Sequence, residues 1–369
     1  MKQTRIYIGQ KAILNDFFQP SQQRENNDKF QQRMLRFLAE PDKFECSIVM
    51  EGEKKLLALI VYDRHKKHEL EIPMLRVGDN PLSATLTRHL IIQSISLSAR
   101  ENRQFTRITD PYLQETVTTA IHEDTFVRVD GGYLRANLAV AETASQLSMR
   151  LTNLATNFGQ DYNFCQKFAE ILSSDGSISD TQTMAQIERR LWPAKVTDAD
   201  ISIFIIPIEP KWAMHLFDKK LANQTLFVAK NELAFNREAV YYKSVTHSKV
   251  LQAPCRILWY VSQDNSFCGT GKIRGCSLID EVNIGKPQEL YQRFQRLGVY
   301  DLATICKIKT NKDGNIMAIR FSNSELFQYA IDLKKIQETL NNKWTFQGIL
   351  QIDKNHFKQL YNLGITNQP

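Results

Sequence analysis

The stretch HELEIPMLRVGDNPLSATL (68–86) decides the fold of the first half of the chain. Apolar and polar residues alternate over its first part, which predicts a strand that places Glu69 and Glu71 on the same side. The following Gly78-Asp79-Asn80-Pro81 predicts a turn, and a helix with an apolar face is expected over residues 83–101. A strand that passes through a short turn into a helix indicates a sheet covered by helices.

The segments on either side of this passage complete a mixed α/β domain. Upstream, an amphipathic helix over 30–38 precedes two apolar stretches that predict a hairpin, ECSIVM (45–50) and LLALIVY (56–62). Downstream we expect a short strand, a helix that begins at Asp110-Pro111, and two last strands around Asp130-Gly131. This order of helices and strands predicts a mixed central sheet with helices packed against it.

The second half of the chain has a different pattern. Residues 141–195 carry helical spacing, and we predict a helical linker there. ISIFII (201–206) is a continuous apolar run, which is typical of a strand buried on both faces. Further short strand patterns with few helices between them predict a small β-barrel. The expected domains are therefore residues 1–140 and 196–361, joined by the linker.

Composition and charge restrict the class of protein. The 369 residues hold no run of about 18 apolar residues, and the chain does not begin with the apolar core of a secretory signal. The six cysteines form no CxxC pair, so we expect a cytoplasmic protein without a metal site. Residues 1–195 hold 25 basic and 24 acidic residues, whereas residues 196–369 hold 22 and 16. A polyanionic partner is therefore expected for the second half.

The order of strands and helices over 45–138, and above all TAIHEDTFVRVDGGYLR (119–135), resembles the GNAT acyltransferase family. The resemblance implies an acyl-CoA donor such as acetyl-CoA, whose pyrophosphate binds backbone N–H groups at a helix N-terminus. The corresponding turn spans 76–84 and provides the candidate cofactor-binding residues Arg76, Val77, Gly78, Asn80, Ser83 and Ala84. An ordinary strand-to-helix turn is the alternative interpretation.

The same resemblance implies acid and base groups for transfer to an amine. The family often uses a glutamate of a central strand as the base, and Glu69 and Glu71 match that position. A tyrosine commonly protonates the departing thiolate in this family. In the helix where the family has this tyrosine, the chain has His122, and Tyr133 in the last strand is a further candidate. Outward-facing polar positions are the alternative for the two glutamates, and an ordinary surface position is the alternative for His122.

Residues 201–336 resemble the ASCH group of PUA-like domains. The resemblance lies in IFIIPIEPKWAMHLFDKK (203–220), RILWYVS (256–262) and GTGKIRGCSLIDEVNIGKPQELYQRF (269–294). The lysine of the family's early signature is present, whereas its glutamate and arginine are missing, so binding is expected and hydrolysis is not. Such folds commonly bind RNA or modified nucleotides. The implied nucleic-acid-binding residues are Lys219, Lys220, Trp259, Tyr260, Lys272, Arg274, Arg293 and Arg296.

The two neighbouring aromatic residues of the expected strand over 256–262 allow a structural prediction. Successive side chains of a strand point to opposite faces, so one of Trp259 and Tyr260 is expected to be exposed or to line a cleft. Aromatic residues of the core and a solvated lysine surface are the alternative interpretation.

These patterns leave three functions open. The first is an acyl-CoA-dependent N-acyltransferase whose basic C-terminal domain recruits RNA or a nucleoside-containing substrate. The second is a non-enzymatic nucleic-acid-binding regulator with a degenerate GNAT-like domain. The third is a partner protein whose helical segment docks other chains, which requires Leu147 and Leu151 to be exposed; packing within the chain is the favoured interpretation. We expect no membrane partner, and the sequence does not indicate an oligomeric state.

Overall fold

The computed structural model describes the chain except residues 1, 15–16, 19–24, 53–54, 175, 219–220, 222–237, 246–250, 344, 346–347 and 367–369. The chain forms two compact units. Unit 1 comprises Met1–Ala139, Thr152–Lys167 and Arg190–Ala194, and unit 2 comprises Val140–Leu151, Phe168–Arg189 and Lys195–Pro369. The helical stretch that was expected as a linker therefore contributes residues to both units.

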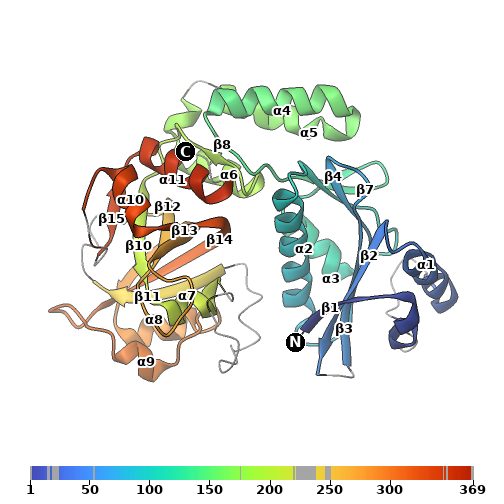
Figure 1. Ribbon diagram of the computed structural model, residues 1–369, viewed down its shortest axis with the longest axis horizontal. Helices are drawn as coiled ribbons and strands as arrows, with labels where there is room; N and C mark the ends of the chain where they lie inside the picture. The colour runs from blue at the N-terminus through green and yellow to red at the C-terminus, as the bar shows by residue number, and fades with distance from the viewer. Residues whose placement is uncertain are drawn as a thin grey trace. The chain divides into compact units, whose positions relative to one another are not determined.

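Unit 1 is built on a seven-stranded sheet with the order β1-β2-β3-β4-β5-β7-β6 (Figure 1). The pair β4–β5 is parallel and the other neighbours are antiparallel. The strands are β1 (Lys2–Ile6), β2 (Phe44–Glu51), β3 (Lys55–Asp63), β4 (Glu69–Val77), β5 (Phe105–Ile108), β6 (Val127–Val129) and β7 (Gly132–Ala136). The predicted hairpin and the predicted mixed sheet are both confirmed.

Helices cover both faces of this sheet. Helices α2 (Ser83–Arg100) and α3 (Glu115–Glu123) lie on one face and α1 (Asn27–Ala39) lies on the other (Figure 1). The reason is the alternation along β3, where Ile60 packs with α2 and α3 whereas Leu59 and Val61 pack with α1. The expected start of α3 at Asp110 is wrong, because the Asp110 carboxylate binds β4 and the helix begins five residues later.

A β-bulge changes the direction of β4 in its middle. Val61 lies opposite Met74 and Asp63 lies opposite Glu71, so β4 carries one extra residue between these two pairs. Pro73 lies inside this bulge. A proline has no N–H to donate, and at a bulge this loss removes no hydrogen bond between the strands. The second half of β4 is therefore turned relative to the first.

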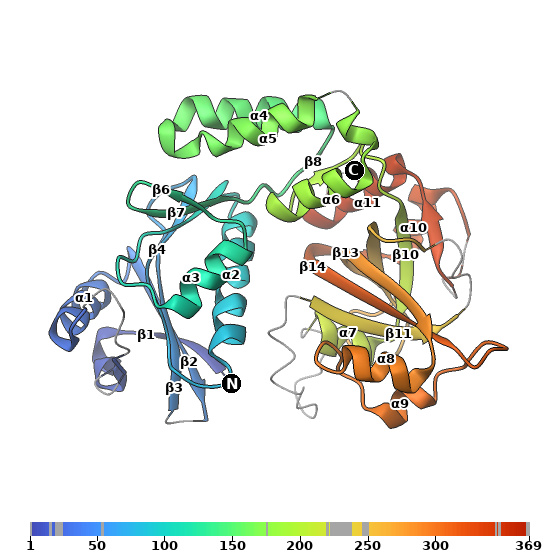
Figure 2. The same cartoon turned by 180° about the vertical axis from the view of Figure 1, so that it is seen from behind.

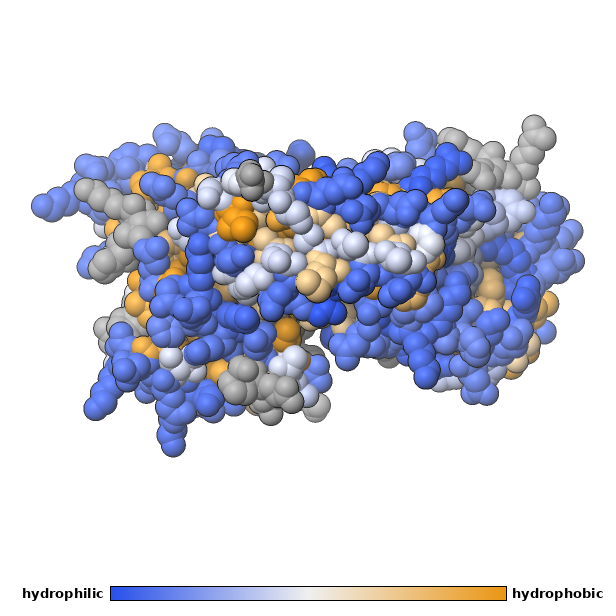
Figure 3. Space-filling model, turned by 90° about the horizontal axis from the view of Figure 1, so that it is seen from above, coloured by the Kyte–Doolittle hydropathy of each residue, from blue (hydrophilic) through white to orange (hydrophobic). Residues whose placement is uncertain are grey.

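The helices between residues 144 and 190 bury most of their apolar residues. They are α4 (Ala144–Phe158), α5 (Phe164–Ser173) and α6 (Thr181–Arg190). Leu147 and Leu151 are both fully buried, which contradicts the exposed leucines that a docking segment requires. Met149 and Ile171 are the exposed large apolar residues of this stretch. Hydrophilic residues cover most of the face seen from above (Figure 3).

Unit 2 is built on a six-stranded sheet with the order β11-β14-β13-β12-β10-β15. The pair β10–β12 is parallel and the other neighbours are antiparallel. Register shifts interrupt the long β13–β14 pairing at three places, and such shifts bend and coil a sheet. The strands are β10 (Ile203–Ile208), β11 (Glu238–Ser244), β12 (Cys255–Val261), β13 (Lys272–Gly285), β14 (Ile316–Asp332) and β15 (Leu350–Ile352), and β8 (Ala141–Glu142) pairs separately with β9 (Lys195–Val196).

Both faces of this second sheet are also covered. Helices α7 (Pro210–Leu216), α8 (Pro287–Phe294) and α9 (Leu302–Cys306) cover one face (Figure 2). Helices α10 (Leu333–Leu340) and α11 (Lys354–Thr366) cover the other. The expected mixed α/β class with helices is confirmed. Unit 2 was expected to be a small β-barrel, and the described strands form a six-stranded sheet in which no pairing joins β11 to β15. None of the helices in the described part of the chain is long and apolar enough to cross a membrane.

Candidate functional site

The candidate site for the acyl-CoA donor lies in unit 1, at the point where the pairing of β4 with β5 ends. Their parallel pairing runs from Glu69–Phe105 to Ile72–Ile108, and the Thr109 amide adds one more hydrogen bond to the Ile72 carbonyl. Beyond this point β4 continues to Val77 without a neighbouring strand on that side. The bulge and the end of β5 together open one edge of β4.

Side chains of unit 1 occupy this open edge. Arg33 Nη2 donates to the Pro73 carbonyl at 2.7 Å, and the Leu75 amide donates to Asp110 Oδ2 at 3.0 Å. Gln114 acts like a short strand, since its amide group accepts from the Val77 N–H and donates to the Val77 carbonyl, both at 2.9 Å. The backbone groups that β4 directs toward this open edge are thus hydrogen-bonded within the unit.

Arg76 lies inside a buried cluster of charges. Its guanidinium pairs with Asp110 and, at 2.8 Å, with Glu25, and all three side chains are fully buried. Arg33 joins the cluster through Glu25 at 2.8 Å and Asp110 at 3.2 Å. The positive charge expected to meet a phosphate is therefore neutralised by two carboxylates, and Arg76 does not face solvent.

The turn after β4 is also closed by its own hydrogen bonds. The Gly78 amide donates to the Leu57 carbonyl at 2.7 Å, and the Asn80 amide donates to Ser83 Oγ at 2.9 Å. The Leu82 amide binds Asn80 Oδ1 at 2.9 Å, and the Ser83 amide binds the Asn80 carbonyl at 3.0 Å. The expectation of free amide hydrogens at these positions is wrong, because the asparagine and serine side chains satisfy the turn locally. Ala84 is exposed in the first turn of α2.

Glu69 and Glu71 differ in their surroundings although they share one side of β4. Glu69 is fully buried, where it accepts hydrogen bonds from Arg107 at 2.9 Å and Tyr162 at 2.8 Å. Burial alone raises its pKa, but Arg107, Lys66 and Tyr162 outweigh burial and hold the pKa of Glu69 below its ordinary value. A general base needs an accessible lone pair of suitable basicity, which Glu69 lacks. Glu71 is half-buried and accepts from Thr109 at 2.8 Å, so it is the more accessible of the two.

His122 and Tyr133 lie next to each other. Their rings meet edge to face with centroids 5.6 Å apart, His122 being exposed at the end of α3 and Tyr133 half-buried in β7. The register of the sheet places Tyr133 opposite Ile108, which lies opposite Ile72 at the end of the β4–β5 pairing. Tyr133 therefore lies two strands away from the last paired residue of β4, and it packs with the residues of the face that α2 and α3 cover.

The expected aromatic surface of unit 2 is absent from β12. Trp259 is fully buried and Tyr260 is 5% exposed, so the prediction that one of them is exposed or lines a cleft is wrong. Trp259 packs beneath α7 and α8, and Tyr260 packs beneath α10 and α11. The reason is that helices cover both faces of the strand. Lys219 and Lys220 lie outside the described residues.

The basic side chains of unit 2 fall into two groups. Arg274 forms a salt bridge with the buried Asp218 at 2.7 Å, and Lys272 is half-buried beside it in β13. Arg293 and Arg296, by contrast, are exposed on and after α8. They belong to a larger exposed set, which we call the α8–α9 basic surface: Lys286, Arg293, Arg296, Lys307, Lys309 and Lys312.

Sequence reasoning missed the residues that fill the β4 edge. Arg33, Glu25 and Gln114 carry no motif, and they come from segments far from β4 in the sequence. Pro73 is the one local signal, because a proline inside a central strand indicates a bulge. A bulge in the strand before the candidate turn predicts that this part of the edge has no strand partner.

No protein-family model and no curated protein sequence matches the chain. Solved structures of both kinds indicated by the sequence do match. The ASCH protein of Zymomonas mobilis matches with 15% identity over 44% of this chain and 94% of its own, with a TM-score of 0.33. The PaiA N-acetyltransferase of Thermoplasma acidophilum in complex with coenzyme A matches with 7% identity over 36% and 95%, with a TM-score of 0.30. An N-acetyltransferase of Staphylococcus aureus matches with 13% identity over 36% and 91%, with a TM-score of 0.27.

Proposed function

We propose that the protein binds nucleic acid through the α8–α9 basic surface. The observation that carries this proposal is the excess of exposed positive charge over residues 286–313. This segment has six exposed basic residues against three exposed acidic ones, Glu289, Asp301 and Asp313. Arg293 also pairs with Glu281, so the three lysines after α9 supply most of the uncompensated charge. A surface of this kind attracts phosphates by charge.

The mode of binding follows from the side chains that are present. The aromatic residues of β12 are buried, so they offer no platform on which unpaired bases could stack. Contacts to phosphates position a nucleic acid but do not read its sequence. The proposed binding is therefore tolerant of sequence and strongly dependent on salt, and it takes place in the cytoplasm.

A salt titration of RNA affinity tests this proposal. Each phosphate contact contributes about −0.7 to the slope of log K against log salt for single strands. We expect Lys307→Gln, Lys309→Gln and Lys312→Gln together to reduce the slope by roughly 2. The matched control replaces three exposed lysines elsewhere in unit 2, Lys334, Lys335 and Lys343, by glutamine. An affinity that is indifferent to salt, or an equal loss in the control, would contradict the proposal.

A second candidate function is acyl transfer from acetyl-CoA by unit 1. The observation that favours it is that side chains, rather than a strand, complete the edge of β4 after Ile72. An acyl-CoA donor could take over the two hydrogen bonds that Gln114 makes to the backbone of Val77 without breaking any pairing between strands. Glu71 would then act as the base and His122 or Tyr133 as the proton donor, and the α8–α9 basic surface would recruit an RNA or nucleoside-containing acceptor.

Thermal unfolding with acetyl-CoA tests this second candidate. Gln114→Ala frees both backbone groups of Val77, so the variant should show a larger stabilisation by acetyl-CoA than the parent protein does. Glu115→Ala changes the neighbouring residue in the first turn of α3 and serves as the control. The absence of any shift at millimolar acetyl-CoA in both the parent and the Gln114 variant would remove acyl transfer.

A further inference from the structure

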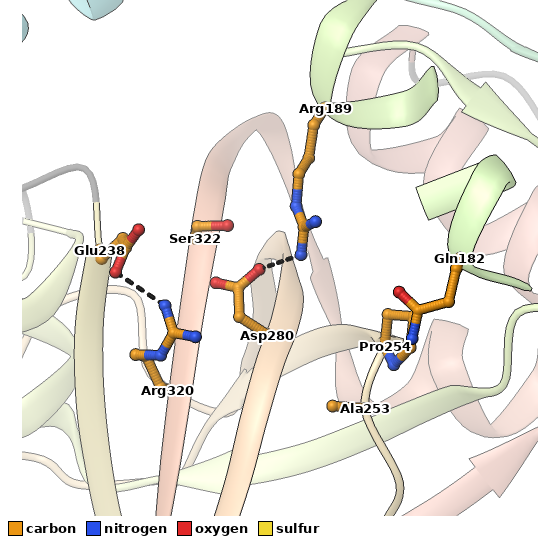
Figure 4. Close-up of a pocket in the computed structure, with 8 residues that line it drawn as sticks. All are labelled: Gln182, Arg189, Glu238, Ala253, Pro254, Asp280, Arg320 and Ser322. Atoms are coloured by element: carbon orange, nitrogen blue, oxygen red, sulfur yellow. Dashed lines mark hydrogen bonds and ion pairs between the residues drawn. The ribbon is translucent and has the colours of Figure 1, made fainter. Parts of the chain in front are cut away.

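A polar cavity lies in unit 2, away from the basic surface. Its volume is about 430 Å³, which falls within the range of small-molecule sites. It opens between α6, the segment before β12, and the strands β11, β13 and β14 (Figure 4). The polar side chains that line it are Gln182, Arg189, Glu238, Asp280, Arg320 and Ser322.

Two ion pairs stand on opposite sides of this cavity. Arg189 pairs with Asp280 on one side, and Arg320 Nη1 pairs with Glu238 at 2.9 Å on the other, with Ser322 between them (Figure 4). Arg320 Nε also binds Glu281 at 3.0 Å. The lining thus carries two positive and two negative charges, so its net charge is zero. A ligand with a net charge would be repelled by the side chains of the same sign.

One carboxylate oxygen of Asp280 has no partner within hydrogen-bond distance among the described residues, although the Ser322 hydroxyl lies close enough to lower the pKa of Asp280. Its side chain is 7% exposed, and its Oδ2 is buried without a hydrogen bond from the described residues. A buried acceptor without a partner is costly, and native proteins usually supply a partner. Burial raises the pKa of Asp280, and the neighbouring Arg189 and Ser322 offset only part of that rise. The site therefore favours a ligand that brings a hydrogen-bond donor to Oδ2.

The opposite side provides a donor. Arg320 uses Nε and Nη1 in its ion pairs, whereas its Nη2 has no hydrogen bond within the described chain. A guanidinium N–H matches a carboxylate oxygen. A ligand that is neutral overall, with an N–H donor at one end and a carboxylate at the other, satisfies both groups.

We propose that this cavity binds a small zwitterion of the α-amino acid type. Its ammonium group donates to Asp280 Oδ2 and its carboxylate accepts from Arg320 Nη2. The side chain of such a ligand extends toward the wall formed by Ala253 and Pro254. This inference is independent of the proposed nucleic-acid binding, since none of these residues belongs to the α8–α9 basic surface.

Titration calorimetry of the full chain tests the proposal. The probes are the twenty protein L-amino acids at millimolar concentration. The amine and the carboxylic acid that lack one charged group of the best binder are measured beside it, for example ethylamine and propanoate for L-alanine. We expect saturable binding of at least one amino acid and at least tenfold weaker binding of both charge-deleted analogues.

Variants connect this binding to the cavity. Asp280→Asn and Arg320→Gln should each weaken binding at least tenfold, whereas Arg293→Gln should change it less than twofold. Arg293 is the matched control, because it also pairs with Glu281 but is exposed and does not line the cavity. If circular dichroism shows that Asp280→Asn does not fold, Arg320→Gln decides the test.

Three results would overturn the proposal. The first is that no amino acid binds at 10 mM or below, in which case water alone satisfies Asp280. The second is that the carboxylic acid lacking the amine binds as tightly as the amino acid. The third is that Arg320→Gln binds like the parent protein. The RNA affinity of the folded Asp280→Asn and Arg320→Gln variants should stay within twofold of the parent value, so a failure here is distinguishable from a failure of nucleic-acid binding.

Discussion

Replacing Asp110 by alanine should destabilise unit 1 more than any surface charge deletion. Asp110 binds the guanidinium of Arg76, accepts from Arg33 at 3.2 Å and accepts from the Leu75 amide at 3.0 Å, and it is fully buried. Its loss leaves the Leu75 amide without its partner, which costs about 1–3 kcal/mol. It also leaves a buried guanidinium with one carboxylate fewer, and breaking a buried ion pair costs about 3–5 kcal/mol.

These two contributions overlap, because Glu25 still pairs with Arg76 at 2.8 Å and water can enter the space left by the carboxylate. We therefore expect a loss of about 4 kcal/mol, near the middle of the range for a broken buried pair. That is a large part of the stability of about 5–15 kcal/mol that folded domains have.

The free energy of unfolding of unit 1 alone is measured by urea unfolding, with hydrogen exchange of the β3 and β4 amides as the probe. Glu123→Ala is the control, because the Arg88–Glu123 pair has both side chains 43% exposed, and exposed pairs contribute about 0–1 kcal/mol. A cost for Asp110→Ala within 1 kcal/mol of the control would refute the argument that this cluster holds the edge of β4.

Two further changes test other parts of the structure. The pKa of Glu69 is held below its ordinary value of 4.5, so its ion pairs stabilise unit 1 above that pH and this stability is lost as the pH falls through the lower folded value. Glu69→Gln should therefore reduce the dependence of the free energy of unfolding on pH in the acidic range, measured by circular dichroism. An unchanged dependence would count against the lowered pKa of Glu69. Gly364→Ala places a Cβ 2.3 Å from the Phe327 ring, and the overpacking cost of about 1–3 kcal/mol exceeds the helix gain of about 0.5–1 kcal/mol. A melting temperature for this variant above the parent value would show that α11 can shift away from β14.

The sequence predicted most elements of unit 1, although not the edge strand β1, because their signals are local. The helix expected over 83–101 is α2, and the two apolar stretches at 45–50 and 56–62 form the β2–β3 hairpin. Asp110 shows the limit of such signals. Its sequence context is typical of a helix cap, yet its carboxylate binds Leu75 and Arg76, which lie 35 and 34 residues away.

The candidate site was only partly predictable for the same reason. The position of the turn after β4 is visible in the sequence, but whether its amides are free depends on Leu57 and on the side chains of the turn itself. The aromatic prediction for β12 assumed that one face of the strand is open. Helices from before and after β12 in the chain cover its two faces, and no property of Trp259 or Tyr260 reveals them.

The sequence by itself determined the two kinds of fold, the strand-to-helix passage at 68–86 and the concentration of positive charge in the second half. These follow from periodicity and composition, which need only neighbouring residues. Tertiary structure alone decided that Glu25, Arg33, Asp110 and Gln114 close the edge of β4, and that α6 brings Arg189 to Asp280. Such contacts join segments distant in sequence, and their stability comes from burial and charge pairing that no local pattern contains.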